Sequence, residues 1–319
     1  MTNSIYRKSL PQLSGLPMLT DGGMETTFVF HEGIDLPHFA AIDLMRNAEG
    51  RETLRTYYRR YTQMSVDHGH GFILESPTWR ASSDWAERLG LSLDELAALN
   101  IDAINLMVEI RDEFASSPQP ILVSGNIGPR GDGYVAGNKM SAAEAERYHA
   151  DQIALFAGTA ADLVTAMTLN YVEEGLGIAK AAKAADIPSV ISFTTETDGN
   201  LPTGQALGDA INQVDAETGN APAYYMINCA HPDHFRDAVA SGGEWVNRIR
   251  ALRANASRMS HAELDEAEEL DDGNPAELGA QYKELMALLP NLTVMGGCCG
   301  TDHRHIEAIS HACYQEHAA

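Results

Sequence analysis

Short apolar runs alternate with longer amphipathic stretches along most of the chain. Helical periodicity, with apolar residues three and four positions apart, fills the longer stretches, among them residues 51–68, 93–114, 142–160, 172–185, 275–289 and 303–313. Between them lie eight runs with the length and composition of buried strands: residues 17–20, 71–74, 121–124, 163–167, 189–193, 223–227, 245–254 (apolar only in its later part) and 292–295. Alternating strands and helices predict a parallel sheet covered by helices.

The number of strands decides between the two common architectures of this kind. Eight strands, each followed by a helical stretch, are what a (β/α)₈ TIM barrel requires. A doubly wound dinucleotide-binding sheet would carry a Gly-x-Gly-x-x-Gly turn after its first strand, and the Asp-Gly-Gly-Met of residues 21–24 does not supply it. We therefore predict a single α/β barrel domain over residues 1–319.

Two segments interrupt the regular alternation. Residues 80–93 have the pattern of a loop and a short helix that enlarge the second connection. Residues 257–274 are strongly acidic and follow the seventh strand, and the loops after barrel strands surround the active site. This acidic segment is either a lid over the site or a solvated helix, and the sequence leaves both open.

The charge of the chain bears on its partners. A formal net charge of −23 disfavours nucleic acid, whose phosphates need a basic surface. No apolar run approaches the roughly 18 residues that cross a membrane, and residues 1–10 lack the apolar block of a secretory signal. We expect a cytoplasmic protein that acts on small molecules, without nucleic-acid or membrane partners; the sequence does not decide whether it forms a homo-oligomer.

Cysteines carry the strongest chemical signal. Four cysteines in such a chain are not expected to form disulfides, and three of them follow predicted strands. Cys298 and Cys299 belong to the Gly-Gly-Cys-Cys-Gly-Thr motif of residues 296–301, in which the glycines allow a turn that points both sulfurs the same way. Cys229 follows the sixth strand.

The C-terminal ends of strands six and eight open into the same cavity of a barrel, so the three thiolates are expected to converge. Catalytic zinc takes three protein ligands and leaves one position open. We predict that Cys229, Cys298 and Cys299 bind Zn²⁺ and act in catalysis through it. Cys313 lies about ten residues into the last helix, roughly 15 Å from the mouth, and is expected to be a packing residue.

Histidines are the alternative ligands. His231 and His234 follow Cys229, and His303 and His305 follow the cysteine pair, but 12 histidines are spread through the chain and proximity alone carries little weight. A supporting or substrate-contacting role fits His231 better than direct ligation. A closed four-ligand site in a zinc-buffering or structural protein is the non-catalytic alternative.

Three thiolate ligands favour one kind of chemistry. They surround zinc with net negative charge, which makes the ion a weak Lewis acid for hydrolysis. A thiol that enters the open position loses its proton and stays electron-rich enough to attack. The ligand set therefore favours S-alkylation, and a zinc-dependent hydrolase is the less favoured enzyme class.

These motifs together resemble the homocysteine S-methyltransferase family, whose domain covers essentially the whole chain. The similarity rests on residues 19–26 (LTDGGMET), 228–229 (NC) and 296–301 (GGCCGT), with support from residues 125–129, residues 198–199 and Asn255. The resemblance implies zinc-dependent transfer of a methyl group to the thiol of homocysteine, giving methionine. It also implies that Asp21, Gly22, Gly23 and Asn228 contribute to the amino-acid pocket.

One position departs from the family pattern. Members commonly carry a glutamate near the end of strand four that contacts the ammonium group of the amino acid, and Met167 occupies that position here. Either another acid replaces it, for which Glu75 at the end of strand two is the candidate, or the acceptor is another thiol or a selenol. Trp79 could face a cationic methyl donor, because aromatic faces attract such groups, or it could pack against its loop. Tyr134 is a similar candidate.

The sequence carries the least information about the identity of the methyl donor. A sulfonium donor, either S-methylmethionine or S-adenosylmethionine, is expected, because no segment has the pattern of a separate folate- or cobalamin-binding domain. Betaine is the alternative. The reaction needs no general base beyond the group that removes the thiol proton, so zinc is the one cofactor expected.

Overall fold

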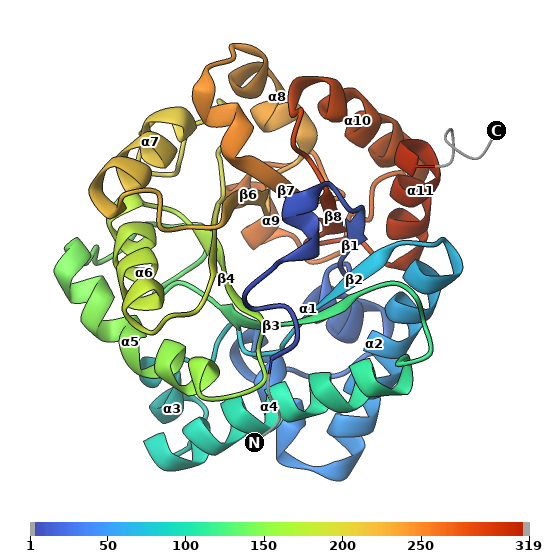
Figure 1. Ribbon diagram of the computed structural model, residues 1–319, viewed down its shortest axis with the longest axis vertical. Coiled ribbons are helices and arrows are strands. Elements are labelled where there is room, and N and C mark those ends of the chain that lie inside the picture. Colours follow the sequence, from blue (N-terminus) through green and yellow to red (C-terminus); the bar gives the residue numbers. More distant parts are fainter. Residues whose placement is uncertain (1–3, 315–319) are drawn as a thin grey trace.

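Eight parallel strands close into a barrel in the computed structural model, which describes residues 4–314. Each strand pairs with its neighbour along the chain, and the first strand also pairs with the last. Figure 1 shows the strands at the centre of a ring of helices. The strands are β1 (Met18–Leu19), β2 (Gly71–Glu75), β3 (Ile121–Ile127), β4 (Leu163–Leu169), β5 (Ser189–Phe193), β6 (Tyr224–Asn228), β7 (Ile249–Ala254) and β8 (Val294–Gly297). The predicted (β/α)₈ barrel is confirmed.

Helices surround the barrel on all sides. Within the described residues they are α1 (Met24–Thr26), α2 (Ala48–Asp67), α3 (Ser83–Arg88), α4 (Leu93–Glu113), α5 (Ala142–Ala157), α6 (Val172–Ala184), α7 (Leu207–Thr218), α8 (Pro232–Ala240), α9 (His261–Glu266), α10 (Pro275–Leu288) and α11 (His303–Tyr314). Ser92 and Ser141 begin α4 and α5 with capping boxes, which explains why these starts are visible in the sequence. None of the helices in this part of the chain is long and apolar enough to span a membrane.

The predicted strands agree with the observed ones except at their ends. The largest difference is in the seventh, whose predicted range began at residue 245. Glu244–Arg248 forms a 3-10 helix instead, and β7 begins at Ile249. The polar side chains of this turn offer no continuous apolar face for a strand to bury, which accounts for the later start.

Strand side chains alternate between the inside of the barrel and the layer beneath the helices. The inner set forms a separate apolar cluster of Leu10, Met18, Ile73, Leu122, Leu163, Met167, Val190, Tyr224, Met226, Ala251 and Val294. Their neighbours along the strands, such as Phe72, Val123 and Ile191, pack with the helices in a larger cluster. The interior of the barrel is therefore filled, and any cavity must lie at one of its ends.

The segment that precedes β1 closes one end of the barrel. Asp162 accepts hydrogen bonds from the backbone N–H groups of Ile5 and Tyr6, at 2.8 and 2.6 Å. Leu10 enters the inner cluster, and the Gln12 amide donates to the hydroxyl of Tyr224 at 3.2 Å. The opposite end, where the strands terminate, is the end left for a site.

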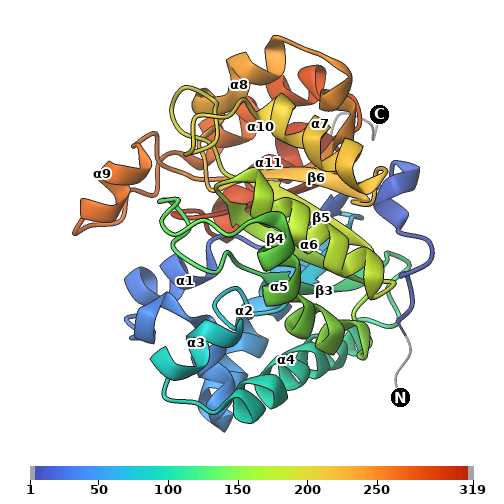
Figure 2. The same cartoon turned by 90° about the vertical axis from the view of Figure 1, so that its left-hand side faces the viewer.

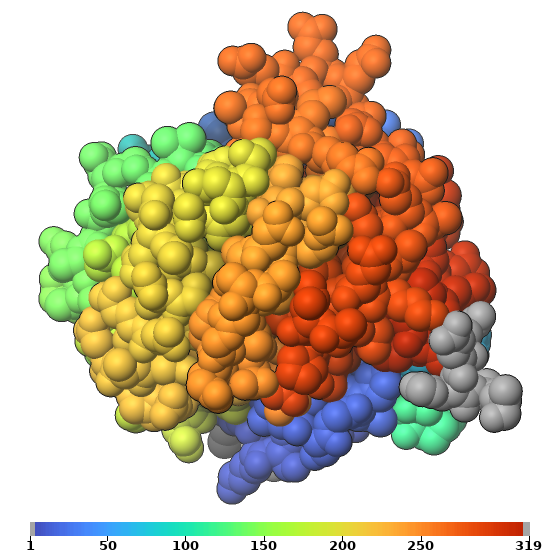
Figure 3. Space-filling model, turned by 90° about the horizontal axis from the view of Figure 1, so that it is seen from above, coloured from blue at the N-terminus to red at the C-terminus, as the bar shows by residue number. Residues whose placement is uncertain are grey.

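The acidic segment, residues 257–274, lies at that opposite end. Figure 2 shows α9 projecting beyond the barrel on the side away from the N-terminal segment, and Figure 3 shows the same region raised above the surrounding surface. Its base is tied down, because Ser257 Oγ donates to Asp271 at 2.6 Å and His305 Nε2 lies 2.8 Å from the carbonyl oxygen of Asp272. The segment therefore stands at the rim of the strand ends.

Candidate active site

A cavity of about 430 Å³ opens at the C-terminal ends of the strands. Residues at or after β1, β2, β3, β4, β6, β7 and β8 form its wall, so distant parts of the sequence meet there. The residues predicted to act in the site all line it: Asp21, Gly22, Gly23, Glu75, Trp79, Asn228, Cys229, Cys298 and Cys299. The barrel brings this set together, while the role of each member remains a prediction.

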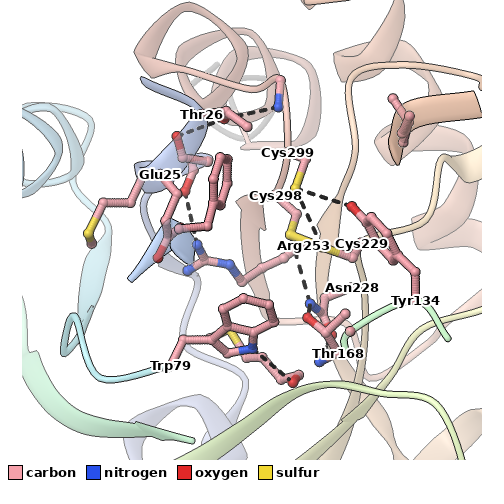
Figure 4. A pocket seen from close by; sticks show the side chains of 18 of the residues that line it. Glu25, Thr26, Trp79, Tyr134, Thr168, Asn228, Cys229, Arg253, Cys298 and Cys299 are labelled. Atoms are coloured by element: carbon pink, nitrogen blue, oxygen red, sulfur yellow. Dashed lines mark hydrogen bonds between the residues drawn. A yellow bond between two sulfur atoms is a disulfide. The ribbon is translucent and has the colours of Figure 1, made fainter. Parts of the chain in front are cut away.

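The three predicted ligand sulfurs converge in this cavity. Cys229, Cys298 and Cys299 place their Sγ atoms within 4.8 Å of one another, and Cys229 Sγ lies 3.8 Å from Cys299 Sγ. Cys229 and Cys298 are joined as a disulfide (Figure 4). The expectation that no cysteine forms a disulfide is wrong for this pair, because the fold brings the two sulfurs together. Cys313 is a free, half-buried cysteine outside the cluster, as expected.

The glycines around the cysteine pair are required mainly because a side chain there would collide with neighbouring atoms. A Cβ atom on Gly23 would lie 2.5 Å from the carbonyl oxygen of Cys298, and one on Gly296 would overlap Thr20 Oγ1. Only Gly300 in the 296–301 motif has a left-handed φ, of 78°. The glycines thus let the turn after β8 press against the turn after β1, which sets the position of both cysteines.

The cysteine cluster fits a tetrahedral zinc ion once the Cys229–Cys298 pair is reduced. Two sulfurs bound at about 2.3 Å to one zinc ion lie about 3.8 Å apart, the separation found between Cys229 and Cys299. Three thiolates are a donor set typical of zinc, and they leave a fourth position for a substrate. Cys229, Cys298 and Cys299 are therefore the residues that could hold a metal.

Two stacked rings lie against the cysteines. Tyr134, in the loop after β3, directs its hydroxyl at Cys299 Sγ over 3.4 Å (Figure 4). Burial and then the charge of Cys299 raise the pKa of Tyr134, so the hydroxyl keeps its proton and donates. The ring of His261 stacks on that of Tyr134 with centroids 4.2 Å apart. His261 Nε2 lies 2.8 Å from the carbonyl oxygen of Cys229 and Nδ1 lies 3.1 Å from Glu196 Oε1.

The carboxylate of Asp21 is already engaged. Arg253 Nη1 donates to Asp21 Oδ1 at 2.6 Å, and the hydroxyl of Tyr57 donates to Oδ2 at 3.0 Å. Arg253 also donates to the carbonyl oxygen of Gly22 at 3.0 Å. Both ends of the ion pair are buried, so removing one partner would leave an uncompensated charge. Asp21 lines the cavity, but both of its carboxylate oxygens are used, and its ion pair fixes Arg253 against the turn after β1.

Two glutamates that line the cavity, Glu75 and Glu25, make no ion pair in the described structure. Burial raises the pKa of Glu75 to about 7 against the opposing effects of Arg253, Ser124 and Thr165. Burial likewise raises the pKa of Glu25 to about 7. Glu75 Oε1 accepts from Thr165 at 3.0 Å, whereas Oε2 has no partner among the described residues. Glu75 thus lines the cavity with one unpartnered carboxylate oxygen, and its role as a substitute for the strand-four acid stays a prediction.

Met167 lies near the end of β4, as expected from the sequence, and it lines the cavity. The next residue, Thr168, has a left-handed φ of 62°, which is rare for a β-branched residue. Asn228 holds this turn, because its Oδ1 accepts from the Thr168 N–H and its Nδ2 donates to Thr168 Oγ1, both at 2.8 Å. Asn228 Nδ2 also lies 3.8 Å from Cys298 Sγ. Asn228 therefore connects the end of β4 to the cysteine cluster.

Trp79 packs against its surroundings and also lines the cavity, while its contact with a methyl donor stays a prediction. Its indole N–H donates to the carbonyl oxygen of Met167 at 3.2 Å, and the guanidinium of Arg80 lies 4.9 Å from its ring centroid. The ring nevertheless lines the cavity (Figure 4). Trp79 is packed within its loop and still presents an aromatic surface to a bound molecule.

None of the histidines named from the sequence joins the cysteine cluster within the described residues. His231 caps α8, where its Nδ1 accepts from the Asp233 N–H, and burial lowers its pKa to about 4. His234 Nε2 is 2.9 Å from the carbonyl oxygen of Arg258, and His305 bonds to Asp302. These histidines fix loops around the site.

Sequence reasoning missed Arg253, Glu25 and His261. Arg253 could have been found, because an arginine within the apolar run of β7 would be buried and a buried charge needs a partner. Glu25 belongs to residues 19–26, which carry part of the family resemblance, but no function was predicted for it. No local signal marked His261, whose position depends on how the acidic segment folds back over Tyr134.

Comparison with known proteins agrees with this geometry. A sequence model described as homocysteine S-methyltransferase matches residues 18–313. No curated protein matches the chain.

Solved structures of one enzyme resemble the whole chain. The oxidized form of the homocysteine methyltransferase MmuM from Escherichia coli has a TM-score of 0.74 and 22% identity, over 95% of this chain and 97% of that chain. Its metallated form has a TM-score of 0.71 and 20% identity, over 94% and 98%. Its apo form has a TM-score of 0.65 and 20% identity, over 96% and 98%. At these identities the likeness establishes the shared fold.

Proposed function

The chain belongs to the homocysteine S-methyltransferase family, and from this premise we propose that it transfers a methyl group from a sulfonium donor to the thiol of homocysteine with the help of zinc. The products would be methionine and the demethylated donor. We place the activity in a reducing, cytoplasmic setting, where the thiols of Cys229 and Cys298 stay free to bind metal.

The observation that carries this proposal is the convergence of three cysteine sulfurs in a cavity at the strand ends. When bound by Cys229, Cys298 and Cys299, zinc would lower the pKa of an acceptor thiol and keep it nucleophilic at neutral pH. A metallated form of the similar E. coli enzyme supports a metal in this fold. A set of three thiolates suits alkylation of sulfur better than activation of water.

The remaining residues would position the two substrates. Asn228 bonds to the backbone of Thr168 and also contacts Cys298. It would therefore fix the position of the turn after β4 relative to the cysteine sulfurs. Trp79 and Phe30 supply an apolar wall against which a methyl donor can lie. In-line alignment of the acceptor sulfur with the donor methyl carbon would supply much of the rate.

A sulfonium donor is favoured by the charge of the rim. Asp265, Glu269 and Asp271, all from the acidic segment, line the outer part of the cavity. A cationic donor such as S-methylmethionine or S-adenosylmethionine would be attracted by these carboxylates and by the face of Trp79. Betaine, which also carries a cationic methyl-bearing group, is the second candidate donor on the same observation.

A methyl-transfer assay on reduced, zinc-loaded protein tests the proposal. L-Homocysteine is offered with S-methylmethionine, S-adenosylmethionine and betaine in turn, and methionine is quantified by mass spectrometry. Cys298→Ala is the site variant, and Cys313→Ala is the matched control because Cys313 lies outside the cluster. We expect methionine from the intact protein and from Cys313→Ala, and none from Cys298→Ala.

The donor that gives product identifies the donor class. A protein that binds one zinc ion at the three cysteines yet methylates no homocysteine would contradict the proposed acceptor and direct the search to other thiols or selenols. A reduced protein that retains no metal would contradict the zinc-dependent chemistry itself.

A further inference from the structure

A second group of metal-ligating side chains lies outside the cavity, where α2 meets α11. His68 is the residue at the C-terminal end of α2, and Glu307 and His311 stand one turn apart on α11. One ligand atom from each of the three side chains lies within 4.8 Å of the other two. The rings of His68 and His311 have centroids 4.9 Å apart. The group is open to solvent on one side, because His68 is half-buried while Glu307 and His311 are exposed.

This group lies at the end of the barrel opposite to the cavity. His70, two residues after His68, directly precedes β2. The hydroxyl of Tyr314 donates to the carbonyl oxygen of Thr293, which directly precedes β8, at 3.4 Å. His70 and Tyr314 also contact each other, with ring centroids 4.6 Å apart. None of the three side chains is among the described residues that line the cavity, so an ion bound to them would act on the barrel and not on the reaction.

The ring of His68 is already held in a way that suits ligation. Its Nδ1 atom lies 2.9 Å from the hydroxyl oxygen of Ser310, a buried residue of α11. In the tautomer in which Nδ1–H donates to this hydroxyl, Nε2 keeps its lone pair for a metal. Ligating histidines usually fix their ring by such a hydrogen bond from the second nitrogen. A residue of α11 thus orients the ligand that α2 contributes.

The donor set selects the class of ion. Two imidazoles and one carboxylate are typical of zinc and related transition metals, whereas calcium and magnesium take oxygen ligands. Donor atoms bound at about 2.1 Å to a tetrahedral ion lie roughly 3.4 Å apart, so ligation would draw the three side chains slightly together. The net charge of −23 also favours a cation. We propose that His68, Glu307 and His311 bind a divalent transition-metal ion such as zinc.

An ion at this place would fasten the barrel where its pairing is shortest. β1 pairs with β2 and with β8 through two residues each, whereas the other neighbouring strands pair through four. The helices α2 and α11, which follow β1 and β8 along the chain, are neighbours in the outer ring (Figure 1). A metal between them would join the first and last parts of the barrel, and an ion that binds only the folded state stabilises it.

Zinc titration of the oxidized protein isolates this site, because Cys229 and Cys298 are then joined as a disulfide. Metal-free protein is titrated with Zn²⁺ by isothermal titration calorimetry, and its thermal unfolding is followed with and without Zn²⁺. His311→Ala removes a ligand at an exposed position and should not disturb folding. His303→Ala is the matched control, because His303 lies on the same helix and belongs to neither group of potential ligands in the described structure.

We expect one zinc ion per chain in the oxidized wild type and in His303→Ala. His311→Ala should lower the zinc affinity by about 100-fold or more, because it removes a ligand. Ser310→Ala should lower it by about 10- to 100-fold, because it keeps all three ligands and frees the ring of His68. Zinc should raise the Tm of the wild type and of His303→Ala by a few degrees, and leave that of His311→Ala unchanged.

Equal zinc affinity in His311→Ala and in the wild type would overturn the proposal, as would an oxidized wild type that binds no zinc. Metal analysis of the reduced proteins keeps this inference separate from the proposed function. The wild type should retain one more zinc ion per chain than His311→Ala, whether or not the cysteines also bind zinc and whether or not methyl transfer is found. Equal zinc content in the two reduced proteins would contradict the second site.

Discussion

Tyr134 and His261 link the cysteine cluster to the loops above it. The Tyr134 hydroxyl donates to Cys299, and His261 holds the tyrosine ring by stacking while it contacts the carbonyl oxygen of Cys229. Hydrogen bonds to metal ligands orient them and tune their charge. The pair therefore bears on how firmly the proposed zinc ion would be held.

Tyr134→Phe should weaken zinc binding by about 10-fold or more, because it removes the hydrogen bond to Cys299 and keeps the ring stack. The measurement is competition for zinc with a chromophoric chelator, on reduced protein. Tyr148→Phe is the control, since the Tyr148 hydroxyl bonds to Ser82 and does not touch the cysteines. Identical zinc affinity in Tyr134→Phe and the wild type would contradict this role.

Glu75 should make stability depend on pH. Burial raises the pKa of Glu75 to about 7 in the folded state, against a usual value of about 4.5 when unfolded. The folded state then binds the extra proton between these values, so this group's contribution to stability is present at low pH and is lost as pH rises from about 4.5 to 7.

Replacing Glu75 by Gln should therefore raise the free energy of unfolding at pH 8 relative to the wild type. Its effect at pH 8 should exceed its effect at pH 5 by up to about 3 kcal/mol. Urea denaturation of metal-free protein at the two pH values measures the difference. The same shift at both pH values would show that Glu75 does not titrate as described.

At the scale of elements, the acidic segment, residues 257–274, contributes several acidic side chains to the cavity wall. Its residues 264–271 include both side chains that line the cavity and side chains that do not. The segment is anchored at one end by His261 and at the other by Asp271 and Asp272. It is therefore fixed at its ends while α9 projects from the surface (Figure 2).

Neutralising the cavity-lining acids should weaken use of a cationic donor. In the double variant Asp265→Asn with Glu269→Gln, we expect KM for the sulfonium donor to rise by roughly two- to fivefold at low salt, and by less at high salt, because exposed charges are screened. The matched control is Glu266→Gln with Glu268→Gln, which removes the same charge from neighbouring residues that do not line the cavity. Equal effects in both pairs would assign the change to overall charge.

At the scale of the whole molecule, the N-terminal segment joins the closed end of the barrel to α5. Arg7 donates to the carbonyl oxygens of Ala157, Thr159 and Ala161 at 2.6–3.1 Å. The last carbonyls of a helix have no partner within the helix, and a cation near them is favourable. This arrangement is remote from the cavity, so it concerns stability alone.

Arg7→Ala should lower the free energy of unfolding by about 1–3 kcal/mol and leave the methyl-transfer rate of the folded protein unchanged. Lys8→Ala is the control, because Lys8 is exposed at the adjacent position. Denaturant unfolding of both variants gives the comparison. A loss of stability as large in Lys8→Ala as in Arg7→Ala would show that the carbonyl contacts contribute nothing specific.

Local patterns were sufficient to predict the eight strands and six of the longer helices, but no range was predicted for α7 or α8. Strand β5 has the predicted bounds, and α4 and α6 end within one residue of theirs, since apolar periodicity and capping residues depend on neighbours in the chain. The count of eight strands then selected the barrel. The largest misassignment is at residues 245–248, where a 3-10 helix stands in place of the predicted start of the seventh strand.

The sequence by itself identified the cysteines on which the proposed chemistry depends. Cys229, Cys298 and Cys299 stand at strand ends, and the rule that such ends share one cavity brings them together without any coordinates. It could not show that the sulfurs of Cys229 and Cys298 approach closely enough to pair, because that depends on the packing of the turns after β1 and β8.

Only the tertiary structure decided which charged groups around the sulfurs pair with one another. The pairing of Asp21 with Arg253 joins residues 232 positions apart, and it leaves Glu75 as the buried acid with an unpartnered oxygen. The stack of Tyr134 on His261 likewise joins the loop after β3 to the start of α9. Hydrogen bonds and ion pairs form over a few ångströms in space, so partners far apart in sequence become visible only when the chain is folded.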